Sequence, residues 1–190
     1  MPRRIQRTIF CTLIFVLLFS ACAFAVAAGT ANLWLDVPFV AQTKDGCGAA
    51  SIAMVMQYWD KQNGNAANLE ADPARILRAL YNQPAHGIYA SAMVGYFKHH
   101  GYRAFAFNAN WIDIERQLHS GRPLIVALKP GSGSSLHYVV VAGIDEPAQL
   151  VLVNDPAARK LLKEDQAQFD REWQATGRWT LLAVPAASVN

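Results

Sequence analysis

The cysteine at position 47 is the residue whose setting best suits covalent chemistry. It is followed by an apolar stretch, AASIAMVMQYW, which predicts a buried helix that begins at Cys47. A helix N-terminus carries partial positive charge and unpaired N–H groups, and both favour a thiolate over a thiol. Such sites lower a cysteine pKa from about 8.5 toward about 3.5–7.5, especially beside a histidine. A nucleophile is one interpretation of Cys47, and a cysteine that simply packs is the other.

We expect the glycine that follows this cysteine to matter for access. Gly48 has no side chain, so a substrate backbone could come close to the sulfur of Cys47. The residues before the cysteine, Thr43 to Gly46, are short and polar and contain a turn-like Asp45-Gly46 pair.

A cysteine nucleophile needs a base, and His137 is the histidine best placed to serve as one. It lies at the start of a very apolar strand predicted over Leu136 to Ile144, just after the flexible turn Lys129 to Ser135. A hydrogen-bonded core histidine is the alternative interpretation. The other four histidines have simpler explanations, as a loop residue or as helix ends: His86, His99, His100 and His119.

The base in turn needs an orienting group, and Asp155 follows the next predicted strand, Leu150 to Val153. If the two strands pair as an antiparallel hairpin, the far end of the second returns to the start of the first. Asp155 then lies near His137, where its carboxylate would fix the ring tautomer and stabilise the imidazolium. The alternative is ordinary turn chemistry, which Asn154-Asp155-Pro156 favours by itself.

A fourth candidate is Gln42, five residues before the cysteine. Its side-chain amide can donate a hydrogen bond to a developing oxyanion, together with the backbone N–H of Cys47. The alternative is a solvated loop glutamine, which is the usual fate of this residue type.

The elements that position these residues fall into two groups. Helices are predicted first, over 47–61, from Pro73 with Asp72 as its N-cap, and over 89–100. Hairpin-linked strands follow, over 102–107, 123–128, 136–144, 150–153 and 178–184, with short helices over 111–119 and 164–174. Residues 35–40 are predicted as a short edge strand or an extended arm. Helices before hairpin-linked strands indicate an α+β fold with an antiparallel sheet.

The N-terminal segment, residues 1–28, reads as a secretory signal. Three arginines precede the apolar run Ile9 to Phe19, and small residues with A-x-A matches follow it. A lipoprotein signal with lipidation at Cys22, or an uncleaved membrane anchor, remains an alternative. A mature chain starting near Ala28 keeps only Cys47, because Cys11 and Cys22 lie in the signal. An odd cysteine in an exported protein indicates a reactive thiol or an intermolecular bridge.

Composition limits the remaining possibilities. The length of 190 residues suits one domain, over 29–190, behind a targeting segment. The formal charge of +3 arises from Arg3, Arg4 and Arg7, since the rest of the chain carries 14 basic and 14 acidic residues. We therefore expect neither nucleic acid nor an anionic membrane surface as a partner, apart from the N-terminal segment. The histidines show no HExxH or paired-ligand spacing, so no metal or other cofactor is expected.

Taken together, these motifs resemble the C39 family of papain-like cysteine peptidases. The resemblance rests on Gln42, on Cys47-Gly48-Ala49-Ala50, on His137-Tyr138-Val139-Val140-Val141 and on Asn154-Asp155-Pro156, in that order, and covers the chain from about Asp36. It implies a papain-like fold in which Cys47 is the nucleophile, His137 the base, Asp155 the orienting carboxylate and Gln42 the oxyanion donor. Many transporter-linked members have the glutamine one residue further from the cysteine.

The best-known members are N-terminal domains of bacteriocin-exporting ABC transporters, which cut leader peptides after a double glycine. This sequence has no GxxxxGK[ST] loop and no multi-span membrane region, so it is similar to the stand-alone, exported members. The resemblance implies a cysteine peptidase that acts on a peptide or secreted protein, with leader processing beside an ABC export system as one role. A papain-like acyltransferase or amidase, and a non-catalytic peptide-binding module of an export system, are the alternatives.

Overall fold

The computed structural model describes residues 32–66, 68–131 and 135–186, so the segment interpreted as an export signal, residues 1–28, lies outside the described residues. The strands form an antiparallel sheet in the order β2-β7-β3-β4-β5-β6, and β1 also pairs with β4. Their bounds are Leu33–Trp34 (β1), Tyr102–Asn108 (β2), Leu124–Leu128 (β3), His137–Asp145 (β4), Leu150–Asn154 (β5), Leu162–Asp165 (β6) and Trp179–Pro185 (β7).

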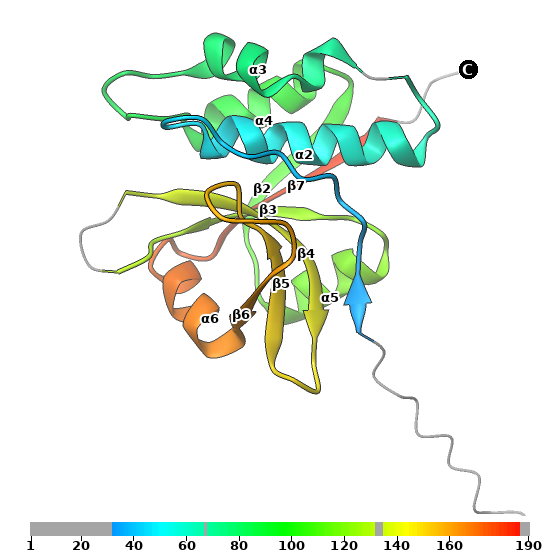
Figure 1. Cartoon of the computed structure of the whole chain (residues 1–190), viewed down its shortest axis with the longest axis vertical. Coiled ribbons are helices and arrows are strands. Elements are labelled where there is room, and N and C mark those ends of the chain that lie inside the picture. The colour runs from blue at the N-terminus through cyan, green and yellow to red at the C-terminus, as the bar shows by residue number, and fades with distance from the viewer. Residues whose placement is uncertain (1–31, 67, 132–134, 187–190) are drawn as a thin grey trace, which may run out of the picture. The chain divides into compact units, whose positions relative to one another are not determined.

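The helices cover both faces of this sheet. They are Cys47–Gln62 (α2), Pro73–Leu80 (α3), Ala90–His99 (α4), Trp111–His119 (α5) and Gln166–Gln174 (α6), with a 3-10 turn at Leu69–Ala71 (η2). The first three lie together along one side of the sheet, where they share an apolar core with it (Figure 1). Side chains of α5 and α6 form a second core on the other face. The predicted α+β class, with N-terminal helices on an antiparallel sheet, is confirmed, and no helix in the described ranges is long and apolar enough to cross a membrane.

Local signals explain where most helices begin. Ten of the sixteen residues of α2 are buried, as its all-round apolar character predicts. Asp72 caps α3 by accepting a hydrogen bond from Arg75 N, and Pro73 occupies the first helical position. Asn110 and Asp113 form a capping box at the start of α5. These starts agree with the predicted helices to within a residue.

The hairpin of β4 and β5 forms as predicted and brings the candidate site together. Val140 pairs with Asn154 and Val141 with Val153, and an irregularity in the pairing follows before Gly143. At Gly143 the neighbouring strand β1 comes so close that a Cβ atom would lie 2.5 Å from Leu33 O, so only glycine fits there.

One predicted element is partly wrong. Helix formation was predicted from Glu164, but Leu162–Asp165 forms the edge strand β6, because these residues continue the sheet beyond β5. The helix begins at Gln166, where Asp165 is the N-cap and accepts a hydrogen bond from Gln168 N. Residues 35–40 have no regular secondary structure, which agrees with the predicted alternative of an arm, and the short strand β1 at Leu33–Trp34 precedes them.

Candidate active site

Cys47 is the first residue of α2 and has a free, half-buried thiol. Gly46 precedes it as the N-cap and offers no side-chain hydrogen bond, so the first N–H groups of the helix have no side-chain cap. Asp45 has a φ of 58°, which agrees with the predicted turn. The backbone amide of Gly48 is among the groups that hydrogen-bond the sulfur. The uncapped helix end therefore faces the thiol, as the sequence predicts.

The glycine after the cysteine has a different role from the one predicted. Gly48 is buried, and a Cβ atom there would lie 3.3 Å from Ile88 Cβ and 3.4 Å from Tyr138 Cδ2. Glycine is favoured at this position because the chain's own side chains pack closely against the helix. Access of a substrate backbone does not explain it.

His137 and Asp155 come from the two strands of the hairpin and form a direct contact. His137 Nε2 lies 2.7 Å from Asp155 Oδ1, and the two side chains are 19% and 15% exposed. Because Nε2 is engaged by the carboxylate, Nδ1 is the ring nitrogen left for the hydrogen bond that His137 makes with Cys47. Asp155 Oδ1 also accepts from Ala157 N, at 2.8 Å, within the turn that follows β5. The structure thus brings Cys47, His137 and Asp155 together in one chain of contacts.

The electrostatics of these three groups favour a thiolate beside an imidazolium. Burial opposes charge on the His137 ring, but hydrogen bonds and charge from Asp155 and Cys47 outweigh it and raise the pKa of His137 to about 9. Burial would also raise the pKa of the Cys47 thiol. Hydrogen bonds from His137 and from the backbone amides of Tyr138 and Gly48 outweigh burial and hold that pKa below its ordinary value. In the same way the His137 contact lowers the pKa of Asp155 against its burial.

Gln42 lies beside the turn that carries Asp155. Its backbone N–H donates to Pro156 O at 2.9 Å, so the arm that leads to Cys47 contacts the segment after β5. The side-chain atom Gln42 Oε1 is buried and has no hydrogen-bond partner among the described residues. No hydrogen bond to Oε1 from the described residues fixes the Gln42 amide. The position of this side chain therefore depends on its packing and on the backbone of the arm.

A cleft of about 390 Å³ opens beside the cysteine. Its walls include Cys47, His86, Ile88, Tyr89, Leu136 and Tyr138. Tyr89 and Leu136 are 52% and 53% exposed, so two apolar side chains stand open to solvent at this cleft. None of the described residues that line it is Asp, Glu, Lys or Arg. The cleft therefore suits an uncharged segment of a ligand.

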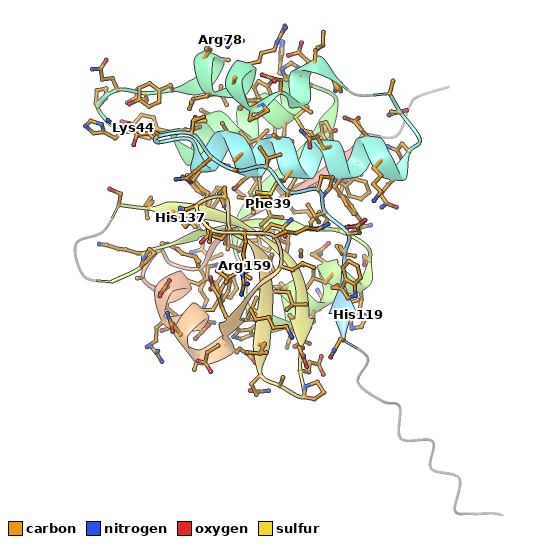
Figure 2. All side chains as sticks on the ribbon, viewed as in Figure 1. Phe39, Lys44, Arg78, His119, His137 and Arg159 are labelled. Atoms are coloured by element: carbon orange, nitrogen blue, oxygen red, sulfur yellow. The ribbon has the colours of Figure 1, made fainter. Side chains whose placement is uncertain are left out.

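The remaining histidines lie away from the Cys47–His137 pair, except His86. His86 belongs to the loop between Asn82 and Gly87, has a φ of 46° and lines the cleft, which sequence reasoning did not foresee. His99 and His119 are exposed, in agreement with solvated helix ends, and Figure 2 shows His119 far from His137. His100 also ends α4, but its side chain is only 19% exposed, because it packs against the Tyr96 ring and lies beside Glu70. Within the described parts of the chain, no group of three or more His, Cys, Asp or Glu side chains could hold a metal ion.

Sequence reasoning missed two buried polar residues that support the site. Ser51, one turn after the cysteine, donates from Oγ to Tyr138 O at 3.2 Å and so ties α2 to the strand of His137. A serine in an otherwise apolar helix was the available signal. Asn154, interpreted as a turn residue, is completely buried and makes hydrogen bonds to three separate residues. Each partner lies outside the local sequence pattern, so pattern analysis did not identify either role.

A third such residue is the half-buried Glu164 on β6. Burial, with the charges of Glu172 and Asp155, raises the pKa of Glu164 to about 7. Asp155 and His137 both act on it electrostatically, so a titrating carboxyl lies near the site. A sequence pattern gave no signal for it, because its neighbours come together only in the folded sheet.

Comparison with known proteins places this geometry in a family. The profile of the Peptidase_C39 like family matches residues 34–181. The chain belongs to the Peptidase_C39 like family. This membership assigns it to the peptidases and confirms the resemblance drawn from the sequence. No curated protein is significantly similar to it in sequence.

Solved structures with the same fold include three peptidases of this kind. A Bacillus anthracis protein assigned to the C39-like peptidases is 18% identical, with 80% of this chain and 97% of that chain covered and a TM-score of 0.62. The peptidase domain of Streptococcus ComA, a bi-functional ABC transporter, is 23% identical, with 77% and 96% covered and a TM-score of 0.59. A double glycine motif protease from an AMS/PCAT transporter, solved with its leader peptide, is 23% identical, with 80% and 94% covered and a TM-score of 0.60. At these identities the likeness establishes the fold.

Proposed function

We propose that this C39-like protein is a cysteine peptidase in which Cys47 is the nucleophile, His137 the base and Asp155 the orienting carboxylate. The observation that carries the proposal is the contact of His137 Nε2 with Asp155 Oδ1 at 2.7 Å, on a ring that also hydrogen-bonds the half-buried thiol. A cysteine that only packs has no need of a histidine held in this way.

The proposed reaction starts from a Cys47 thiolate beside a protonated His137. The thiolate of Cys47 attacks the carbonyl carbon of the peptide, and the carbonyl oxygen becomes an oxyanion. The uncapped N–H of Cys47 and the Gln42 amide supply hydrogen bonds to that oxygen. His137, protonated because its pKa is raised to about 9, gives its proton to the leaving amine. Water, deprotonated by the same ring, then hydrolyses the thioester and restores the thiolate.

We propose a peptide or protein substrate with uncharged residues around the cleaved bond. The cleft beside Cys47 has apolar side chains in its walls, with Tyr89 and Leu136 open to solvent, and none of its described residues is Asp, Glu, Lys or Arg. A charged substrate residue would lose water there without gaining a partner. Leader-peptide processing beside an export system extends this proposal, because a structural relative of similar size is described as a double glycine motif protease bound to a leader peptide.

We also propose that the protein is exported. The basic and apolar character of residues 1–28 and the single cysteine of the remaining chain support this. Determining the N-terminus and mass of the protein isolated from its host distinguishes cleavage near Ala28, lipidation at Cys22 and an uncleaved anchor.

The test of peptidase function combines a substrate search with two variants. The wild-type domain should release new amino termini from a peptide library, while Cys47→Ser and His137→Ala should lose this activity by at least a hundredfold. A matched exposed residue, His119→Ala, serves as the control. Transfer of the acyl group to an added amine in preference to water would identify an acyltransferase, and peptide binding without any turnover would identify a binding module.

A further inference from the structure

The arm between β1 and α2 carries Gln42 but has little secondary structure of its own. From Val37 to Gln42, its hydrogen bonds to other parts of the described chain run to Asn154, the last residue of β5, and to the turn that follows β5. Val37 O and Pro38 O accept from Asn154 Nδ2, at 3.1 and 3.3 Å. Gln42 N donates to Pro156 O at 2.9 Å. Before this stretch the arm is held by Leu35 N, which donates to Ala142 O, and by ion pairs of Asp36 with Lys61 and Lys160. The part of the arm from Val37 to Gln42 is therefore the part that is tied to Asn154 and Pro156.

The Asn154 side chain is suited to this role in a way that few others would be. It is completely buried, its two amide protons serve two carbonyls of the arm, and Asn154 Oδ1 accepts from Leu161 N at 2.9 Å. Aspartate lacks the donors, and serine is shorter and has a single proton to give. The residue thus joins the arm, the end of β5 and the start of β6.

Its chain neighbour is Asp155, whose backbone is held in a turn by Asp155 N to Arg159 O and by Ala158 N to Asp155 O. One tripeptide therefore contacts both halves of the proposed chemistry. Asp155 orients His137, while Asn154 and Pro156 hold the arm that bears Gln42. Figure 2 shows His137 and Phe39 of the arm along the boundary between the helices and the sheet.

We propose that Asn154 is a positioning residue that holds the arm with Gln42 in place relative to Asp155 and His137. The proposal rests on the peptidase function above. Because Gln42 Oε1 has no hydrogen-bond partner among the described residues, displacement of the arm backbone moves the amide as well. Cys47 and His137 lie on α2 and β4, outside the stretch of the arm that Asn154 holds. Loss of the Asn154 donors should therefore impair the oxyanion step and spare the thiolate.

Two reagents separate these effects without a known peptide substrate. With para-nitrophenyl acetate, the thiolate forms a thioester, the ester C–O bond breaks and para-nitrophenolate leaves, after passing through an oxyanion. With iodoacetamide, the thiolate attacks the carbon that bears iodine and iodide leaves, without an oxyanion. The rate of this alkylation therefore reports the reactivity of the thiolate alone. The ratio of the two rates measures oxyanion stabilisation.

The variants are Asn154→Ser, Asn154→Asp, Gln42→Ala and the double variant Asn154→Ser with Gln42→Ala. Removing an oxyanion donor typically costs about a hundredfold or more, so Gln42→Ala should lower the ratio by that order. Asn154→Ser should lower the ratio at least about tenfold. In the double variant, Asn154→Ser should change the ratio of Gln42→Ala by less than about threefold, because the oxyanion donor is already gone. Asn108→Ala is the matched control, since Asn108 is exposed and donates to Gly177 O in the turn before β7.

An unchanged ratio in a folded Asn154→Ser protein would overturn the proposal, and so would losses that multiply in the double variant. If the serine variant does not fold, the same ratio is read in Asn154→Asp, which keeps the side-chain shape and the acceptor for Leu161 N. A wild-type protein that para-nitrophenyl acetate does not acylate would instead refute the peptidase function, and the positioning role would fall with it.

Discussion

The Cys47–His137 pair predicts how the reactivity of the thiol depends on pH. Replacing His137 by alanine removes the hydrogen bond and the positive charge that lower the pKa of Cys47, and leaves the burial that raises it. The pKa of the thiol should therefore rise to its ordinary value of about 8.5 or above. The measurement is the rate of iodoacetamide alkylation between pH 4 and 10, in the domain without residues 1–28.

The size of the effect depends on the pH at which it is read. Below both pKa values, each unit by which the pKa rises cuts the thiolate about tenfold, while each remaining thiolate becomes about threefold more nucleophilic. The rate at acid pH should therefore fall about threefold for each unit of pKa. In the wild type, a second and smaller rise should appear near pH 9, where His137 loses its proton, and this rise should be absent from His137→Ala.

The control for this prediction is His119→Ala, which replaces an exposed histidine at the end of α5. It should leave the profile unchanged. If the midpoint of Cys47 alkylation is the same in the wild type and in His137→Ala, the two residues are not coupled. The proposed catalytic pair would then have to be abandoned, whatever the distance between His137 and Asp155.

Three further predictions concern the surroundings of the pair. Ser51→Ala removes a buried hydrogen bond to Tyr138 O and should lower the free energy of unfolding by about 1 kcal/mol, measured by urea titration. Burial raises the pKa of Glu164 from 4.5 to about 7, so its cost to folding grows as the pH rises from about 4.5 to about 7 and is constant above that. Glu164→Gln should therefore stabilise the protein by up to about 3 kcal/mol at pH 8 but hardly at pH 4, and equal gains at both pH values would contradict this. Gly48→Ala should push Ile88 outward and lower thermal stability, while a Tm at or above that of the wild type would argue against tight packing there.

Much of the fold follows from local patterns in the sequence. The apolar run after Cys47 predicts α2, and the pair Asp72-Pro73 predicts the start of α3. The approach of His137 to Asp155 follows from pairing two apolar runs across a short turn. This prediction succeeds because the position of the turn determines the antiparallel register, and the register determines which residues face each other at the open end of a hairpin.

What could not be predicted depends on contacts between distant segments. Leu162–Asp165 reads LKED, which favours a helix, but backbone pairing with β5 makes it a strand. The roles of Ser51 and Asn154 depend on partners 87 and 117 residues away. The packing that requires glycine at position 48 comes from Ile88, in a loop that the sequence assigns no role. In each case tertiary contact, and not local preference, decides the outcome.

The two halves of the proposed chemistry have different structural supports. The thiol lies at the start of α2, a helix with ten buried residues, and its histidine lies on a central strand of the sheet. The proposed oxyanion donor Gln42 lies on an arm whose stretch from Val37 to Gln42 is hydrogen-bonded to the rest of the described chain through Asn154 and Pro156. Thiolate formation should therefore withstand changes in the arm that leave Cys47, His137 and the core intact, whereas acylation should respond to small changes around Asn154. Substitutions in the arm or at Asn154 that leave the core untouched should accordingly change the rate of acylation while the reactivity of the thiol stays constant.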